Sequence, residues 1–109
     1  MRVRFFAYLR DFTGCAETDI PYGELVAERV TTSEGTPLVT AGALARSLCE
    51  LYGDKLRQKI FPPGNSGEDK FGPEIIILIN GRHVSHLGGF TAPLNPDDRV
   101  DVFPVVAGG

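Results

Sequence analysis

The first residues alternate between a side that is uniformly apolar and a side that is mostly basic. Over residues 2–10 the apolar side holds Val3, Phe5, Ala7 and Leu9. A period of two is typical of a half-buried strand, so the pattern predicts a strand over residues 2–10. A turn over residues 11–16 and a return strand over residues 17–20 would complete an antiparallel hairpin, which Pro21 and Gly23 would end.

A helical spacing of apolar residues follows in the middle of the chain. The side chains that recur every three or four positions are Ala41, Leu44, Ala45, Leu48, Leu51 and Tyr52. This spacing forms one apolar stripe along a helix, which Thr40 would cap and Gly53 would end. A second, short helix would begin at Asp54 and turn Leu56 and Ile60 inward.

Apolar runs near the end of the chain predict further strands. The continuous run at residues 74–79 is typical of a strand that is buried on both faces. Asn80-Gly81 indicates a type I′ turn, so residues 82–84 would return as a short strand. Residues 99–103 would form the last strand. In that strand the inward residues would be Val100 and Val102, and the outward residues would be Asp101 and Phe103.

Two stretches lack a regular period. Residues 24–39 mix β-forming residues with loop residues, and we expect a strand extension with an irregular loop there. Residues 62–73 are polar and rich in Pro and Gly, which predicts a long mobile loop. Gly88-Gly89 and residues 93–98 are expected to be turns.

The order of these elements predicts an α+β fold. The 109 residues are the size of one domain. Two strands precede the main helix and three follow it, so the helix would pack across a mixed sheet of about five strands. The last strand can then lie parallel to the first at the centre of the sheet. This arrangement is the β-grasp architecture of ubiquitin-like proteins.

Composition and charge exclude several classes of function. The net charge of −3, from 11 basic and 14 acidic side chains, provides no basic face for nucleic acid. No apolar run approaches the length of a membrane span, and no signal peptide precedes the first strand. Cys15 and Cys49 are too few for a disulfide framework, although the sequence leaves open whether they pair. We therefore expect a cytoplasmic protein.

The sequence shows no active site built from side chains. His83 and His86 have no cysteine or carboxylate cluster beside them, so no metal site is expected. No Ser/His/Asp, Cys/His or phosphate-loop arrangement is present, and no bound cofactor is expected.

The C-terminus carries the candidate chemistry. Gly108 and Gly109 follow an apolar run directly, so the terminal carboxylate has no side chain near it. Such a tail can enter a narrow channel in which other sequences would clash. The reacting group would be the main-chain carboxylate of Gly109, and the protein would be a carrier or a substrate, not an enzyme.

Residues 104–109 are expected to form a flexible tail. Pro104 lacks an N–H and would help to end the sheet, after which the extended tail could reach about 20 Å. The apolar residues that would grip a partner's channel are Val105, Val106 and Ala107.

Three aromatic residues, Phe6, Tyr8 and Phe103, would share the outer face of the sheet. An exposed aromatic cluster is typical of a docking site for another protein. The alternative is that the loops at residues 21–39 and 62–73 simply cover these side chains.

Residues 4–10, residues 79–82 and residues 93–109 carry a family resemblance, most specifically in the ending Phe-Pro-Val-Val-Ala-Gly-Gly. Together they resemble the sulfur-carrier family typified by the small subunit of molybdopterin synthase, that is, the MoaD-like and ThiS-like proteins. The resemblance runs from the first strand to the last residue. Residues 21–39 and 62–73 look like insertions relative to the shortest members.

The resemblance implies a specific series of partners. An adenylating enzyme related to ubiquitin-activating enzymes would use ATP and magnesium to convert the Gly109 carboxylate to an acyl-adenylate. A sulfurtransferase would then deliver sulfur and leave a thiocarboxylate on Gly109. Inside the large subunit of molybdopterin synthase, this thiocarboxylate would supply the sulfur of molybdopterin, the ligand of the molybdenum or tungsten cofactor.

Three alternatives stay open. The chain could carry sulfur for cysteine or for the thiazole of thiamin, with the same chemistry at Gly109. It could be a ubiquitin-like modifier whose Gly109 forms isopeptide bonds with lysines. It could also be a β-grasp binding module with an inert tail.

Overall fold

A five-stranded mixed sheet forms the centre of the protein in the computed structural model, which describes residues 1–22, 30–31, 37–62 and 70–105. The strand order is β2-β1-β8-β5-β6. The bounds are β1 Arg2–Phe5, β2 Glu17–Asp19, β5 Ile75–Ile79, β6 Arg82–His83 and β8 Arg99–Pro104. β1 and β8 run parallel side by side, whereas β2 and β5 flank them in antiparallel pairing. This confirms the predicted central pair and the α+β class.

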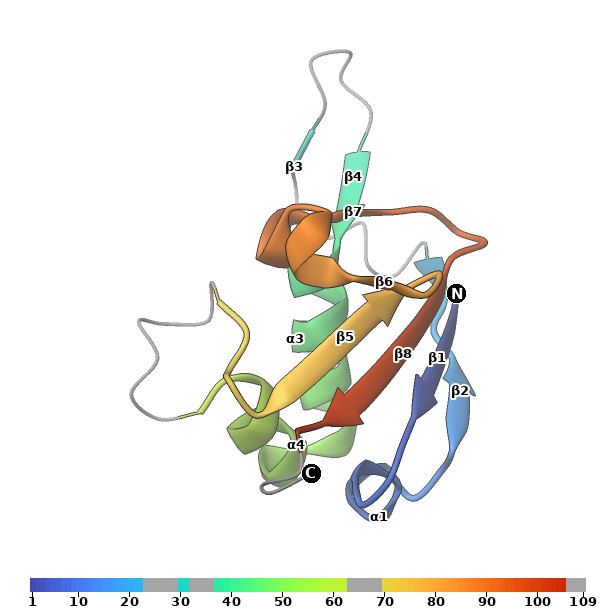
Figure 1. Ribbon diagram of the computed structural model, residues 1–109. Helices are drawn as coiled ribbons and strands as arrows, with labels where there is room; N and C mark the ends of the chain where they lie inside the picture. The colour runs from blue at the N-terminus through green and yellow to red at the C-terminus, as the bar shows by residue number, and fades with distance from the viewer. Residues whose placement is uncertain (23–29, 32–36, 63–69, 106–109) are drawn as a thin grey trace.

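The main helix, α3, lies across one face of the sheet (Figure 1). It spans Ala41–Tyr52, as the apolar stripe predicted, and the short helix α4, Asp54–Ile60, follows it. Thr40 caps α3, because its Oγ1 accepts a hydrogen bond of 3.2 Å from the N–H of Ala43. Gly53 ends the helix at a φ of 89°.

The core lies between α3 and the inner face of the sheet. Its fully buried side chains include Val3, Phe5, Leu9, Val39, Leu48, Leu56, Ile60, Leu94, Val100 and Val102. Leu51 was expected in the stripe but is 60 % exposed. It lies in the last turn, at the margin of the stripe when residues are spaced 100° apart around the helix axis. No described helix is long and apolar enough to cross a membrane.

The first strand is shorter than predicted. β1 ends at Phe5, and a short helix, α1, spans Leu9–Thr13. Ala7 adopts a left-handed φ of 55°, which takes the chain out of the sheet. Leu9 is still buried, because the turn of the helix carries it into the core. The alternation therefore predicted the burial of Leu9 correctly, but it was wrong about Ala7, which is exposed, and about the element.

β5 is buried on one face only, which corrects the prediction of a strand buried on both. Ile75, Ile77 and Ile79 are buried, whereas Ile76 and Leu78 are half-buried. The reason is that none of the described helices covers the outer face of the sheet (Figure 1).

The turn after β5 has the predicted form. Asn80 and Gly81 have φ values of 51° and 85°, as a type I′ turn requires. β6 contains only Arg82 and His83, because the chain enters the short 3-10 helix η1, Val84–His86, directly afterwards.

A second, smaller sheet contains strands from the predicted extension at residues 24–39, and it includes Pro93 and Leu94, which were wrongly expected to lie in a turn. It has the order β3-β4-β7, with β3 at Val30–Thr31, β4 at Pro37–Thr40 and β7 at Pro93–Leu94. Between η1 and β7 lies a second 3-10 helix, η2, at Gly89–Thr91. Most of the predicted irregular stretches at 24–39 and 62–73 lies outside the described residues.

Candidate functional site

The candidate tail leaves the body of the protein from the central strand. β8 lies between β1 and β5 and ends near α1 and α4 (Figure 1). The N–H of Val105 still donates a hydrogen bond of 2.9 Å to the carbonyl oxygen of Glu74, and Val105 is 44 % exposed. The predicted tail residues Val106, Ala107, Gly108 and Gly109 lie outside the described residues, and their roles stay predictions.

Pro104 belongs to β8 and not to the tail, which corrects the predicted tail boundary. It is buried and lies opposite Ile75 in the ladder with β5. The carbonyl oxygen of Val102 faces β1, where it accepts a hydrogen bond from the N–H of Phe6. Residues two positions apart in a strand turn their main-chain groups to the same side, so those of Pro104 also face β1. β1 has already turned away there, and the missing N–H of proline therefore breaks no ladder hydrogen bond.

An ion pair lies beside Val105, the first residue after β8. Lys59 of α4 places its Nζ 3.1 Å from Glu74 Oε2, and Glu74 is the residue that binds the main chain of Val105. The same Nζ lies 5.4 Å from the centre of the Tyr8 ring. The hydrogen bond to Glu74, followed by the one to Tyr8, raises the pKa of Lys59. Only the fold brings Lys59 next to Glu74, because the two residues lie 15 positions apart on different elements.

An aromatic pair occupies the outer face of the sheet. The rings of Phe6 and Phe103 are stacked, with centroids 4.2 Å apart and planes inclined by 9°. Both residues are half-buried, and the Arg4 guanidinium lies 5.4 Å from the centre of the Phe6 ring. Phe103 lies opposite Ile76 of β5, so apolar surface continues onto the next strand. We call Phe6, Phe103 and Ile76 the outer apolar face.

Tyr8 does not join this face, contrary to the sequence prediction. It lies at the N-terminus of α1, where its ring contacts Phe12 edge to face at 5.6 Å, and it packs against the core. The cause is that β1 ends at Phe5, so the alternation of a strand no longer determines where the side chain of Tyr8 points. Its proposed part in docking stays a prediction.

A buried carboxylate ties β1 to β8 beside the aromatic pair. Asp101 accepts two hydrogen bonds from Arg4, from Nε to Oδ1 at 2.7 Å and from Nη2 to Oδ2 at 3.1 Å. Arg99 Nε lies 3.5 Å from the same Oδ2. The hydrogen bond to Asp101 raises the pKa of Arg4. Asp101 points outward as predicted, but the two arginines bury it to 4 % exposure.

Other chemistry is sparse in the described part of the chain. No group of three or more His, Cys, Asp and Glu residues there could hold a metal ion. Cys15 and Cys49 are not joined by a disulfide, which answers the question of their pairing. Cys15 Sγ lies 3.6 Å from the hydroxyl of Tyr52, whose pKa is raised mainly by burial.

A helix packed across a mixed sheet, with parallel first and last strands at its centre, defines a ubiquitin-like β-grasp protein. The model of the ThiS family matches residues 3–109, and the chain belongs to this family. The expected resemblance to ThiS-like sulfur carriers is thereby confirmed.

Three relatives illustrate the similarity. Small archaeal modifier protein 3 of Haloferax volcanii is 35 % identical over 109 residues, which cover 100 % of this chain and 98 % of the relative. The solution structure of small archaeal modifier protein 1 from Methanosarcina acetivorans has a TM-score of 0.69 at 28 % identity, with 99 % and 94 % of the two chains covered. A Pyrococcus furiosus protein described as molybdopterin converting factor, subunit 1, shares the fold, with a TM-score of 0.61, 24 % identity and coverage of 96 % and 95 %.

Proposed function

We propose that this protein is a sulfur carrier whose reacting group is the main-chain carboxylate of Gly109. The observation that carries the proposal is the match to the ThiS family, which extends to residue 109 and so includes the terminal diglycine. The described structure is compatible with it, because β8 brings the chain to an exposed Val105 four residues before that end.

The chemistry needs activation by a partner. A carboxylate is a poor electrophile, so an adenylating enzyme would use ATP and magnesium to join the Gly109 carboxylate to AMP, with release of pyrophosphate. A sulfur nucleophile supplied by a sulfurtransferase would then attack the acyl carbon, and AMP would leave as the new bond to sulfur forms. The protein itself would supply only a tail without bulky side chains at Gly108 and Gly109.

The outer apolar face would dock these partners. Phe6 and Phe103 form a half-buried stack on the sheet face that no described helix covers, and large aromatic residues dominate the binding energy of many interfaces. The same face would meet the adenylating enzyme and the large subunit of the synthase in turn. We place these reactions in the cytoplasm, where ATP is available.

We propose molybdopterin as the product that receives the sulfur. The ending Phe-Pro-Val-Val-Ala-Gly-Gly and the resemblance to the small subunit of molybdopterin synthase support this choice. Carriers for cysteine or for the thiamin thiazole would use the same tail chemistry, so the recipient enzyme distinguishes them. Co-purification of the chain from its native host would identify that enzyme.

A second candidate function is protein modification through Gly109. The similarity over the full length to small archaeal modifier protein 3 favours it. In this case the activated carboxylate would react with a lysine amine and form an isopeptide bond.

Mass spectrometry of the protein from its native host separates these functions. Replacement of one oxygen by sulfur at Gly109 is expected for the carrier. For the modifier, trypsin would cleave after Arg99, so residues 100–109 are expected to remain attached to lysines of other proteins. If Gly109 is unmodified in every fraction, both the carrier and the modifier function are rejected. The remaining alternative is then a β-grasp binding module with an inert tail.

A Gly109→Leu variant tests the activation step. We expect it to abolish ATP–pyrophosphate exchange by the activating enzyme, because the side chain would clash in a narrow channel, while the thermal unfolding midpoint stays unchanged. Normal exchange with this variant would contradict the proposed chemistry.

A further inference from the structure

A charged row crosses the outer face of the sheet next to the outer apolar face. Arg4 of β1 lies opposite Asp101 of β8, and Asp101 lies opposite Leu78 of β5. Residues that lie opposite each other on neighbouring strands point to the same face of a sheet, and so do residues two positions apart in one strand. Arg99, Asp101 and Phe103 therefore share this face of β8, and the charges border the aromatic pair.

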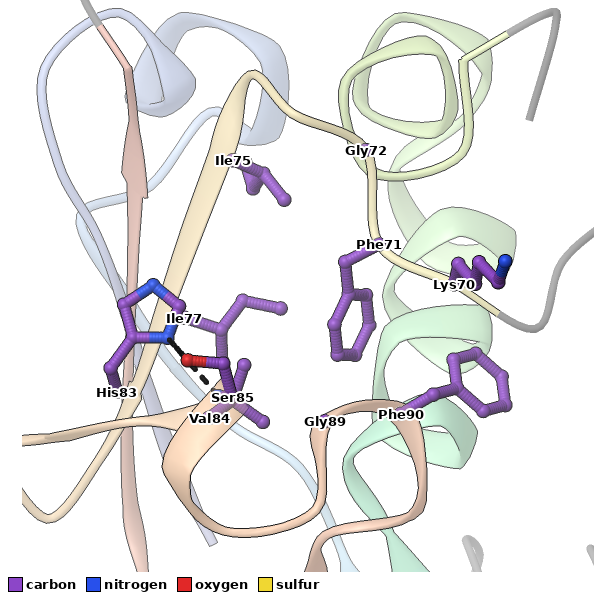
Figure 2. A pocket seen from close by; sticks show the side chains of 10 residues that line it. All are labelled: Lys70, Phe71, Gly72, Ile75, Ile77, His83, Val84, Ser85, Gly89 and Phe90. Carbon is purple, nitrogen blue, oxygen red and sulfur yellow. Dashed lines mark hydrogen bonds between the residues drawn. The ribbon is translucent and has the colours of Figure 1, made fainter.

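An apolar cavity of about 290 Å³ lies on the inner side of β5 and not on this face. Figure 2 shows Ile75 and Ile77 on the side of the strand that faces Phe71. Ile76 and Leu78 alternate with them and therefore point to the outer face. None of the described helices covers that face, so its side chains are accessible to a partner (Figure 1).

A buried carboxylate holds two guanidinium groups in place on the outer face. The Asp101 side chain is buried, whereas the side chains of Arg4 and Arg99 are 38 % and 49 % exposed. The two guanidinium groups are thus the accessible part of the cluster. Because Asp101 positions them before a partner arrives, less side-chain freedom is lost on binding.

The cluster has N–H donors to spare. A guanidinium group carries five of them. Arg4 uses Nε and Nη2 to bind Asp101. Arg99 approaches Asp101 with Nε at 3.5 Å, and its two terminal nitrogens have no hydrogen-bond partner within the part of the chain that the structure describes. Donors arranged in this planar fork match the two oxygens of a carboxylate.

The charges within the cluster do not balance. Asp101 faces two guanidinium groups, which leaves one positive charge. Two neighbouring carboxylates have other partners, since Glu17 Oε1 lies 3.3 Å from Arg2 Nε and Asp98 accepts hydrogen bonds from two asparagines. The net charge of the whole chain is −3. The rest of the chain would therefore repel a polyanion, whereas a single acidic side chain is attracted to the cluster.

We propose that Arg4 and Arg99 bind a single carboxylate side chain of the partner that docks on the outer apolar face. The site is continuous with that face, because the Arg4 guanidinium lies 5.4 Å from the centre of the Phe6 ring. Arginine and large aromatic residues are enriched at the energetic centres of interfaces. The partner's surface therefore carries an Asp or Glu next to an apolar side chain. This site rests on the proposed function, since it specifies the chemistry of the partner at the docking face described there.

Substitution of Arg99 tests the site with the adenylating enzyme as the partner. Arg99→Gln should weaken binding about tenfold and Arg99→Glu about a hundredfold, because a glutamate there would repel the partner's carboxylate. Arg99→Lys should fall between the original chain and Arg99→Gln, since an ammonium group keeps the charge but lacks the planar fork. Arg4 still donates both hydrogen bonds to Asp101 in these variants, so the buried carboxylate stays paired.

The matched control is Lys55→Gln, which removes one positive charge from an exposed residue of α4, outside the outer face (Figure 1). Its affinity should equal that of the original chain. In ATP–pyrophosphate exchange, Arg99→Gln should raise the KM for this chain and leave the maximal rate unchanged, because the tail is intact. Equal affinities of the Arg99→Gln, Arg99→Glu and Lys55→Gln variants would refute the carboxylate site and leave the tail chemistry untouched.

Titration of the full chain with acetate, followed by NMR, tests the site without a partner. The Nε–H signal of Arg99 should shift more strongly than that of Arg82, an exposed arginine that has no carboxylate partner within the described residues. Equal shifts of the two signals would overturn the proposed site. If the original chain supports no pyrophosphate exchange, the proposed activation fails, and the acetate titration still decides whether the arginine pair binds a carboxylate.

Discussion

At the scale of single residues, the aromatic pair on the sheet is the part of the candidate site that local pattern predicted well. Phe6 and Phe103 were expected on one face, and their rings are stacked at 4.2 Å. Tyr8 was expected with them and lies instead at α1, where Lys59 approaches its ring. The difference arises because one left-handed residue, Ala7, ends the alternation before Tyr8.

Truncation of the aromatic pair should weaken binding to the activating enzyme. Phe6→Ala and Phe103→Ala should each lower the affinity about ten- to a hundredfold, as is common for central aromatic residues of an interface. Titration calorimetry measures the effect. Leu51→Ala is the control, because Leu51 is exposed on α3, away from this face, and its loss should leave the affinity unchanged. Full affinity of both phenylalanine variants would exclude this face as the docking surface.

At the scale of elements, the boundaries with local causes were predictable. Thr40 and Gly53 bound α3 because a hydroxyl can satisfy a free N–H at a helix start and glycine tolerates a positive φ at its end. Asn80 and Gly81 form the turn for the same local reason. The ends of β1 and β6 were not predicted, because the alternating pattern does not show that Ala7 turns left-handed or that His83 caps η1.

Removal of the cap should destabilise α3 and hence the fold. Thr40→Ala is expected to lower the free energy of unfolding by about 1 kcal/mol, because the N–H of Ala43 loses its acceptor. Chemical denaturation measures the change. Ser47→Ala in the same helix is the control and should be neutral or slightly stabilising, since alanine has the higher helix propensity. Equal stability of the Thr40→Ala variant and the original chain would show that this hydrogen bond contributes nothing.

At the scale of the whole molecule, stability should depend on pH in the alkaline range. Burial raises the pKa of Tyr52 above its ordinary value of 10.0, and the hydrogen bond to Glu74 raises that of Lys59 above 10.5. The folded protein thus holds both protons more tightly than the unfolded chain does. This contribution to stability is complete below the ordinary values and is lost as the pH rises through the raised ones.

Thermal unfolding across this range tests the linkage. The midpoint should fall as the pH rises above about 10, and Tyr52→Phe should make the fall shallower, because one of the two titrating groups is removed. The slope against pH is the informative quantity, since the substitution also removes the contact with Cys15. An identical slope for the Tyr52→Phe variant would contradict a role for Tyr52.

The sequence by itself determined the features that depend on neighbours along the chain: the apolar stripe of α3, its caps, the turn after β5, and a tail without side chains at Gly108 and Gly109. These features follow from periodicity and backbone freedom, which act within a few residues. They were sufficient for the fold class, whereas the family came from the resemblance of residues 4–10, 79–82 and 93–109 to known sulfur carriers.

Only the tertiary structure decided which distant residues meet. Arg4 and Asp101 are 97 positions apart in the chain, and the parallel register of β1 and β8 joins them. The placement of Lys59 beside Glu74, and the apolar cavity between β5 and Phe71, likewise depend on strand pairing and helix packing. No local pattern encodes such contacts, because each is determined by the simultaneous packing of several elements.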